Sequence, residues 1–331
     1  MTDRVTGPDA SVTTMRGPMR VLVVSNMAPA PDDPARGAFV RTQVAALRRL
    51  DGADVELFEF RPGAYASAAR ALRRMRGFDV VHAHFGLTAW PALAVRGAAR
   101  AVTLHGTDVL HPRSWRITSA ALGRMDLVAA ASEELAALVR RRRPHTDVAV
   151  LPAGVDLDRF RPLDRAHSRE RLGLDPLARI ALFPADPARP AKHAERASEV
   201  ARLAGAQLLT LGHVDPDEVP HWVNAADAVL VPSEREGFGL AVLEALACDV
   251  PVLATPVGIH REALDGIAGT LCAPYDASTW TKAFKTAPAR IEGRDRASRW
   301  GSDALAEGVL TAWRSLVDSS PEAPIDGAVL S

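Results

Sequence analysis

The chain has 331 residues, and its 40 lysines and arginines balance 40 aspartates and glutamates, so the formal net charge is zero. This balance argues against a dedicated nucleic-acid binder, which usually carries a basic excess, and 47% hydrophobic residues exclude wholesale disorder. Two cysteines, Cys248 and Cys272, are too few for a disulfide-rich scaffold or a multi-cysteine zinc site. The charge is unevenly divided, because residues 1–150 hold 21 basic and 14 acidic side chains and the remainder holds the opposite excess.

Short apolar runs alternate with amphipathic segments through the first half of the chain. The runs predict strands at residues 19–25, 55–60, 79–84, 101–105, 126–131 and 148–151. Helices are expected at residues 38–50, 66–75, 89–96 and 133–143, the last one capped by Ser132. Short apolar strands that alternate with helices indicate a parallel sheet covered on both faces.

The same alternation restarts after a predicted linker at residues 153–174. Strands are expected at residues 179–183, 208–211, 227–231 and 251–254, and helices at residues 192–204, 240–247, 279–286 and 297–316. The connection before residue 227 has room for only one strand. The fold class is therefore α/β, with two Rossmann-like doubly wound domains that face each other across a cleft.

The domain boundaries follow from these segments. Residues 1–18 and 319–331 are expected to be disordered tails, residues 19–152 a first domain, residues 153–295 a second domain, and residues 296–318 a helix that can cross to the first. No run of about 20 apolar residues and no signal-peptide core is present, so a cytoplasmic protein is expected. Residues 25–30 contain no glycine, which argues against an ordinary dinucleotide-binding fold.

Chemistry concentrates in residues 231–255, which are expected to form a strand, a glycine loop, a helix and another strand. The loop lies at the carboxyl end of a parallel strand, where open α/β sheets bind ligands. Gly237 and Gly239 allow the backbone to approach a ligand closely, and the helix start presents free N–H groups to phosphate or sugar oxygens. Glu236 can accept hydrogen bonds from sugar hydroxyls. Glu244, inside an apolar helix, faces either a ribose diol or solvent.

Glu236-Gly-Phe-Gly-Leu-Ala-Val-Leu-Glu244 resembles the Glu-x7-Glu motif of the retaining nucleotide-sugar glycosyltransferases of family 4, which have the GT-B fold. Residues 79–86, 103–108 and 151–160 resemble other segments of that family, in the same order. Asp249 and Ala153 depart from it, since they stand where the family usually has Gly and Asn. The resemblance assigns residues 19–152 to the acceptor side and residues 153–295 to nucleotide-sugar binding.

The resemblance also implies roles for individual residues of the motif. Glu236 would face the donor sugar and Glu244 would bind the ribose hydroxyls. Backbone N–H groups of the loop would hold sugar and phosphate oxygens, and the nucleotide base would lie near the backbone of a second loop. The implied donor-binding residues, besides Glu244, are Gly237, Phe238, Gly239, Leu240, Gly212 and His213.

Three histidines lie at the ends of two predicted strands in the first domain. The resemblance places His105 at the reaction centre, and the alternative is a structural histidine. His82 and His84 lie two residues apart, on one strand face, and are expected on the acceptor side together with Gly37. No nearby carboxylate or thiol completes a ligand set with these histidines, so no metal site is expected.

A pyrophosphate group needs fixed cations, which the family supplies from the loop after the first strand of the second domain. Here that loop contains Arg189 and Lys192, three residues apart. We expect both to bind phosphate, although they can also be solvated loop charges. Lys192 is one of only three lysines in the chain.

The resemblance implies transfer of a sugar from a nucleotide diphosphate sugar, most simply a UDP or GDP sugar, to an acceptor hydroxyl with retention of anomeric configuration. Neither a cofactor nor a metal is expected. Two alternatives are a nucleotide-sugar 2-epimerase of the same fold and a non-catalytic nucleotide-sugar-binding homologue. The acceptor can be a lipid, a saccharide or a small metabolite, and no nucleic-acid partner is expected.

Basic segments at residues 66–76 and 140–143 are compatible with peripheral membrane contact by the first domain, or with a solvated helix face.

Overall fold

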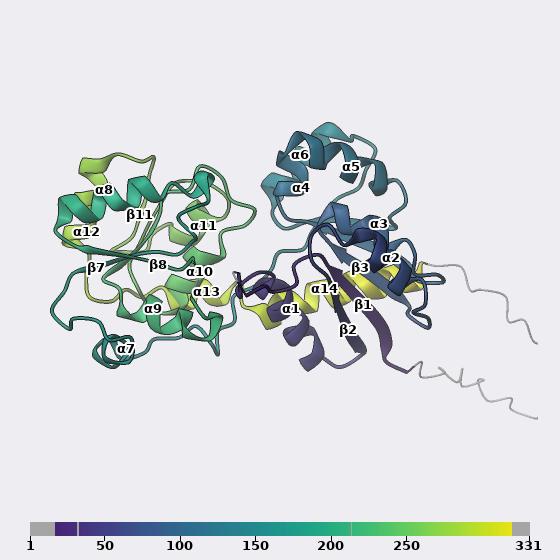
Figure 1. Cartoon of the computed structure of the whole chain (residues 1–331), viewed down its shortest axis with the longest axis horizontal. Coiled ribbons are helices and arrows are strands. Elements are labelled where there is room, and N and C mark those ends of the chain that lie inside the picture. Colours follow the sequence, from purple (N-terminus) through teal and green to yellow (C-terminus); the bar gives the residue numbers. More distant parts are fainter. Residues whose placement is uncertain (1–16, 32, 213, 320–331) are drawn as a thin grey trace, which may run out of the picture.

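Two parallel sheets organise the chain, and the computed structural model describes residues 17–31, 33–212 and 214–319. The first sheet has the strand order β2-β1-β3-β4-β5-β6 and the second β11-β10-β9-β7-β8, with all pairings parallel. Helices flank both sheets, and the two domains lie side by side (Figure 1). The expected α/β architecture is confirmed, while nearly all of the predicted tails lies outside the described residues.

The first domain follows the predicted alternation with adjusted ends. Its strands are β1 (Met19–Ser25), β2 (Ala53–Glu59), β3 (Val80–His84), β4 (Ala99–Leu104), β5 (Leu127–Ala130) and β6 (Ala149–Val150). Its helices are α1 (Ala38–Arg49), α2 (Tyr65–Leu72), η1 (Gly86–Thr88), α3 (Ala89–Ala92), α4 (Thr107–Leu110), α5 (Pro112–Leu122) and α6 (Glu133–Arg142). Helix α5 was not expected from the sequence, and it begins with a proline at its first turn after the capping residue His111.

The second domain is fuller than the sequence indicated. Its strands are β7 (Ile180–Phe183), β8 (Gln207–Thr210), β9 (Ala228–Val231), β10 (Val252–Ala254) and β11 (Leu271–Cys272). Its helices are α7 (Arg165–Arg171), η2 (Pro190–Lys192), α8 (Ala194–Ala204), η3 (Pro216–Glu218), α9 (Val219–Ala225), α10 (Leu240–Ala247), α11 (His260–Leu264), α12 (Ala277–Thr286) and α13 (Arg294–Ser298). The connection before residue 227 has one strand, β8, as expected, but it also contains α9, and β11 adds a fifth strand.

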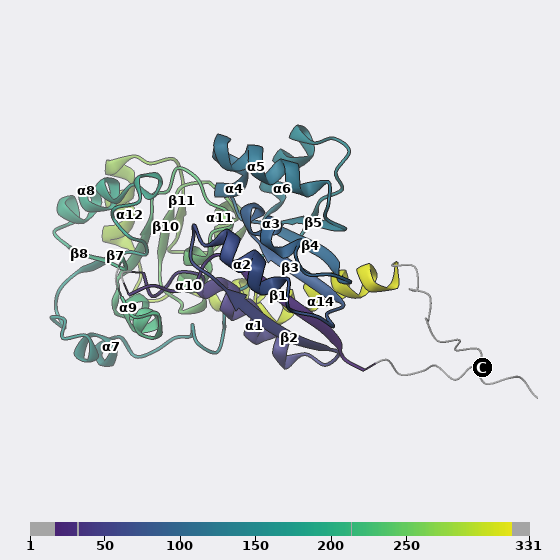
Figure 2. The same cartoon turned by 45° about the vertical axis from the view of Figure 1, so that its right-hand side comes forward.

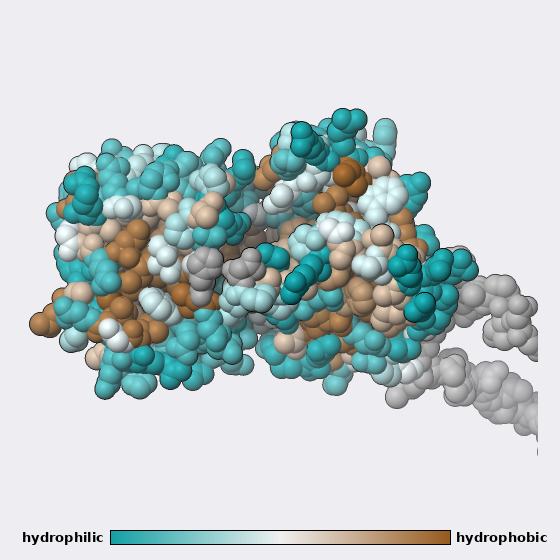
Figure 3. Space-filling model, viewed as in Figure 1, coloured by the Kyte–Doolittle hydropathy of each residue, from teal (hydrophilic) through white to brown (hydrophobic). Residues whose placement is uncertain are grey.

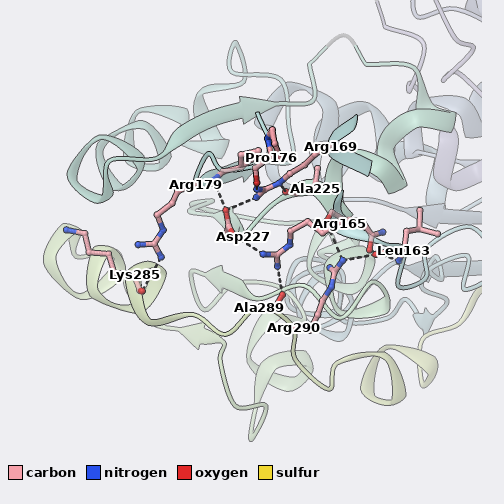
Figure 4. Close-up of polar contacts among 12 residues, drawn as sticks. Leu163, Arg165, Arg169, Pro176, Arg179, Ala225, Asp227, Lys285, Ala289 and Arg290 are labelled. Atoms are coloured by element: carbon pink, nitrogen blue, oxygen red, sulfur yellow. Dashed lines mark hydrogen bonds and ion pairs between the residues drawn. The ribbon is translucent and has the colours of Figure 1, made fainter. Parts of the chain in front are cut away.

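The predicted linker at residues 153–174 is partly helical, because it contains α7. Ion pairs hold this helix against the sheet. Asp227, just before β9, accepts hydrogen bonds from Arg165 at 2.9 Å and from Arg169 at 3.1 Å (Figure 4). The same carboxylate accepts the backbone N–H of Ile180 at 2.7 Å. One aspartate thus joins α7 to the start of two neighbouring strands, at the edge of the sheet opposite the strands' carboxyl ends.

The long C-terminal helix α14 (Ser302–Asp318) belongs to the core of the first domain. Ala306, Val309, Leu310 and Trp313 pack with residues of α1, β1 and β3, and both views show α14 (yellow) lying along the first domain (Figures 1 and 2). The predicted helix at residues 297–316 is therefore two helices, α13 and α14.

The chain crosses between the domains twice, and the two crossings are hydrogen-bonded to each other. The N–H of Val155 donates to the carbonyl of Trp300 at 2.9 Å, and the N–H of Ser302 donates to the carbonyl of Val155 at 2.8 Å. Polar residues cover much of the surface, which is indented where the domains meet (Figure 3). Within the described residues, no helix is both long and apolar enough to span a membrane.

Candidate active site

The two domains touch at the carboxyl ends of their sheets, where the glycine loop of the second domain meets the end of β4. A Cβ atom added at Gly237 would lie only 2.1 Å from the carbonyl oxygen of His105, and one added at Gly106 would lie 3.4 Å from Cα of Gly237. Only a residue without a side chain allows this approach. The contact brings the loop that carries Glu236 directly against the strand end that carries His105.

Glu236 and Lys192 form a buried ion pair in the second domain. Nζ of Lys192 lies 2.6 Å and 2.7 Å from the two carboxylate oxygens of Glu236, and the two side chains are 16% and 10% exposed. Burial alone would raise the pKa of Glu236, but Lys192 holds it below its usual range, so the carboxylate is charged. Two ammonium protons are used in this pair, which leaves the third free for a ligand.

The other residues predicted to bind the phosphates and the base have no described contact with Glu236 or His105. Arg189 is exposed and makes no side-chain hydrogen bond or ion pair with the described residues. Gly212 lies against the loop after β7, since a Cβ there would come 3.2 Å from Cα of Asp186. His213 lies outside the described residues. Lys192 is therefore paired with Glu236, whereas the side chain of Arg189 has no partner among the described residues.

The three histidines of the first domain form a continuous stack. The ring centroids of His82 and His84 are 4.9 Å apart and those of His84 and His105 are 5.1 Å apart. Nε1–H of Trp313, on α14, donates to Nδ1 of His82 at 3.0 Å, so Nε2 of His82 carries the proton that reaches Oγ1 of Thr103 at 2.8 Å. Both ring nitrogens of His82 therefore have partners within the protein, and its side chain is buried.

His105 is uncharged and firmly oriented. Nδ1 of His84 and Nε2 of His105 are 3.0 Å apart, so one proton is shared between them. Burial lowers the pKa of His84 to about 4, and burial followed by the neighbouring imidazoles lowers that of His105. Since His84 is also buried, it supports His105 from behind and presents no exposed surface to an acceptor.

A buried carboxylate that the sequence analysis did not single out shapes the turn after β4. Asp108 accepts backbone N–H groups from His105 at 3.0 Å, from Gly106 at 2.8 Å and from Gly86 at 3.0 Å. Burial raises the pKa of Asp108, and these three donors oppose that rise. The position of Asp108, three residues after His105, was the available signal, because short acidic side chains commonly bond to nearby backbone N–H groups.

Two aromatic side chains frame His105. Phe39, in the first turn of α1, lies 4.9 Å from the His105 ring, and Phe85 lies 4.7 Å from it. Phe85 has φ of 72°, a strained value for a residue with a side chain, and such strain often occurs at functional sites. Gly37 begins α1 beside Met27, whose carbonyl oxygen would lie 2.4 Å from an added Cβ. Gly37 thus allows the start of α1, which carries Phe39, to pack closely against Met27.

Glu244 lies partly buried on α10 with no hydrogen-bond partner among the described residues. Burial raises the pKa of Glu244 to about 7, and the nearby Arg159 opposes the rise. Helix α10 begins at Leu240, directly after Gly239, and no side chain caps its first N–H groups. Helix α10 therefore offers a ligand the carboxylate of Glu244 and the free backbone donors of its first turn.

Both departures from the family pattern have structural explanations. Asp249 has φ of 54°, and its carboxylate accepts the N–H groups of Gly293 and Arg294, each at 2.8 Å. An aspartate tolerates this left-handed conformation and here fastens the start of α13 to α10. Ala153 is buried near the first crossing between the domains. Neither side chain belongs to the site.

A cavity of about 320 Å³ lies between the domains beside α1. It is lined from the first domain by Ala38, Arg41 and Thr42, and from the second by Arg159, Asp215 and Asp217, among others. Ala38 directly precedes Phe39 in α1, but Phe39, Phe85 and His105 do not line this cavity. Among the described residues, no group of three or more histidines, cysteines or acidic side chains is arranged to hold a metal ion.

Two family models cover most of the chain. The model described as Glycosyltransferase Family 4 matches residues 16–159, and the model described as Glycosyl transferases group 1 matches residues 178–287. The D-inositol 3-phosphate glycosyltransferase of Frankia alni is 30% identical over 72% of this chain and 74% of its own length. The protein of the same name from Actinosynnema mirum is 30% identical over 71% of this chain and 72% of its own length.

Solved structures show the same fold at low sequence identity. The sucrose-phosphate synthase of Thermosynechococcus elongatus superposes with a TM-score of 0.68 at 19% identity, over 91% of this chain and 100% of that one. HepE of Anabaena, in complex with UDP-glucose, gives a TM-score of 0.68 at 17% identity, over 90% of this chain and 100% of that one. With the paired domains and the Glu236 loop, these comparisons lead to one conclusion: the chain belongs to the family 4 glycosyltransferases and has their GT-B fold.

Proposed function

We propose that the enzyme transfers a sugar from a nucleotide diphosphate sugar to an acceptor hydroxyl, with retention of configuration and without a metal ion. The observation that supports the proposal is the contact of Gly237 with His105, because the same loop carries Glu236 and its partner Lys192. In this proposal Glu236 orients the donor sugar, Glu244 binds the ribose hydroxyls, and the backbone of residues 238–240 holds sugar and phosphate oxygens.

The chemistry of the proposed step lies in the leaving group. The bond from the anomeric carbon to the diphosphate oxygen breaks, the acceptor oxygen bonds to the same face of that carbon, and the departing phosphate takes the acceptor proton. Lys192, Arg189 and the start of α10 stabilise the negative charge that develops on the phosphate. Because His105 is uncharged, it acts by hydrogen bonding and shape and contributes no formal positive charge.

The acceptor would enter from the first domain. The cavity beside α1 has room for a small polyhydroxylated molecule, and its lining carries charges of both signs, including Arg41 and Asp217. Relatives named D-inositol 3-phosphate glycosyltransferases make a cyclitol phosphate the first acceptor to test. The basic excess of residues 1–150 favours an anionic acceptor.

A thermal-shift screen of UDP-, GDP-, ADP- and TDP-sugars tests the donor, because a ligand that binds only the folded state raises the melting temperature. Turnover is then measured with the selected donor and a panel of cyclitol, saccharide and lipid acceptors, and the anomeric configuration of the product is read by NMR. An inverted product would contradict retention. Turnover that EDTA abolishes would contradict metal independence.

Three variants test the site assignment: Lys192→Ala, Glu236→Ala and His105→Ala. Each is expected to lower kcat by a factor of about 100 or more, because each removes a positioning or electrostatic contribution at the reacting atoms. Near wild-type turnover in all three would show that the reaction centre lies elsewhere. Incubation with the nucleotide sugar alone also distinguishes transfer from 2-epimerisation.

Peripheral membrane contact is proposed for the basic surface of the first domain. Arg70, Arg73, Arg74 and Arg76 are exposed, although α2 ends at Leu72, before the last three of them, and does not reach residue 75 as expected. Anionic lipids attract such clusters. Co-sedimentation with phosphatidylserine vesicles at low salt is the test, and a protein that stays in the supernatant would rule this contact out.

A further inference from the structure

A buried histidine below the glycine loop has one ring nitrogen that nothing in the described structure satisfies. His260, the first residue of α11, is fully buried, and its Nδ1 lies 2.8 Å from the carbonyl oxygen of Thr255. A carbonyl oxygen can only accept, so Nδ1 carries the ring proton. Nε2 of His260 is therefore a bare acceptor, and it has no hydrogen-bond partner.

The ring edge that carries Nε2 faces the donor loop. A Cβ added at Gly239 would lie 2.8 Å from both Nε2 and Cδ2 of His260. A side chain at position 239 would therefore collide with the ring edge that carries the unsatisfied nitrogen, and only a glycine leaves this edge uncovered. Gly239 also has φ of 119°, a backbone conformation that favours glycine. Both this conformation and the clash with His260 therefore exclude a side chain at position 239.

The chemistry of this nitrogen selects the kind of group that can reach it. Burial lowers the pKa of His260 even though Glu236 opposes the effect, so the ring is uncharged at neutral pH. A phosphate oxygen has only lone pairs to offer and cannot bond to a bare imidazole nitrogen. A hydroxyl can donate to it, and a sugar carries several hydroxyls on adjacent carbons.

We propose that Nε2 of His260 accepts a hydrogen bond from a hydroxyl of the donor sugar. This inference rests on the proposed function and adds a specificity residue to it. Glu236, which the proposed function places at the donor sugar, would bind a second hydroxyl of the same sugar. Donors that lack the hydroxyl facing His260, or carry a bulky substituent there, are discriminated against.

The test compares UDP, UDP-glucose and the UDP-glucose analogues that each lack one ring hydroxyl, with binding measured by calorimetry. The GDP-mannose series replaces them if the donor screen selects guanine. Wild-type protein is expected to bind one deoxy analogue about tenfold more weakly than the parent sugar nucleotide. In His260→Asn, whose amide can still donate to Thr255, that difference shrinks to about twofold or less.

Several controls separate a sugar contact from a structural role. His260→Phe repeats the test without the Thr255 bond, and His145→Asn makes the matched change at an exposed histidine in the first domain. Affinity for UDP alone is expected to stay within about twofold of wild type in all three variants. An unchanged deoxy penalty in His260→Asn, or an equal loss of UDP and UDP-glucose affinity, would overturn the inference. If wild-type protein binds no nucleotide or nucleotide sugar, the proposed function itself fails first.

Discussion

The contact between the domains at Gly237 can be tested by adding one methyl group. In Gly237→Ala the new Cβ would lie 2.1 Å from the carbonyl oxygen of His105. Real Cβ contacts are essentially never shorter than 3.0 Å, so the loop and the end of β4 must separate by about 0.9 Å or more. No positive φ is involved at this position, so the perturbation is purely steric.

A displacement of about 1 Å at a reaction centre lowers the rate by a factor of about 100, and we expect kcat of Gly237→Ala to fall by that amount. In the proposed function the second domain alone holds the nucleotide portion of the donor, so affinity for the nucleoside diphosphate should change much less. Steady-state transfer kinetics with the donor chosen by the thermal-shift screen, together with calorimetric titration of the diphosphate, measure both quantities.

Gly123→Ala is the matched control, because its added Cβ would have no neighbour closer than 3.9 Å. Its kcat should equal that of the wild-type enzyme. A Gly237→Ala enzyme with wild-type kcat would refute the reasoning, since it would show that turnover does not require this close approach of the two domains. A parallel loss of folding stability would instead indicate that the loop itself is disrupted, and urea unfolding detects this.

Three further predictions concern stability. The folded-state pKa of Glu244 is raised to about 7, so its contribution to stability is complete at acid pH and is lost as pH rises towards 7. The free energy of unfolding of the wild-type protein should therefore fall with rising pH more steeply than that of Glu244→Gln. Trp313→Phe should cost about 2 kcal/mol, because the buried Nδ1 of His82 loses its donor. Asp227→Asn should cost about 2–3 kcal/mol, because the arginines of α7 lose their shared carboxylate.

Urea unfolding measures the stability change in all three predictions, and a different result would contradict each one. Parallel pH profiles for wild type and Glu244→Gln would mean that the carboxyl titrates normally. A Trp222→Phe variant, whose indole makes no side-chain hydrogen bond to the described residues, controls for the loss of ring size in Trp313→Phe. Glu218→Gln removes the carboxylate partner of Arg171, which is exposed, and should leave the midpoint unchanged, so an equal effect there and at Asp227 would contradict the burial argument.

The sequence by itself determined the local structure and the location of the glycine loop that carries Glu236. The alternation of apolar runs predicted six strands in the first domain, and β1 and α10 have the predicted ends. Ser132 caps α6 as expected, since its side chain accepts the N–H of Leu135. These features depend on residues close together in the chain, which explains why periodicity and capping patterns reveal them.

Contacts between distant segments were decided by the tertiary structure. Trp313 reaches His82 across 231 positions of sequence, and this bond fixes the tautomer at the base of the histidine stack. The unsatisfied nitrogen of His260 and the Gly237–His105 contact likewise depend on how loops meet once both sheets have formed. Parallel strands place their carboxyl ends at one edge, but side-chain packing decides which groups face each other there.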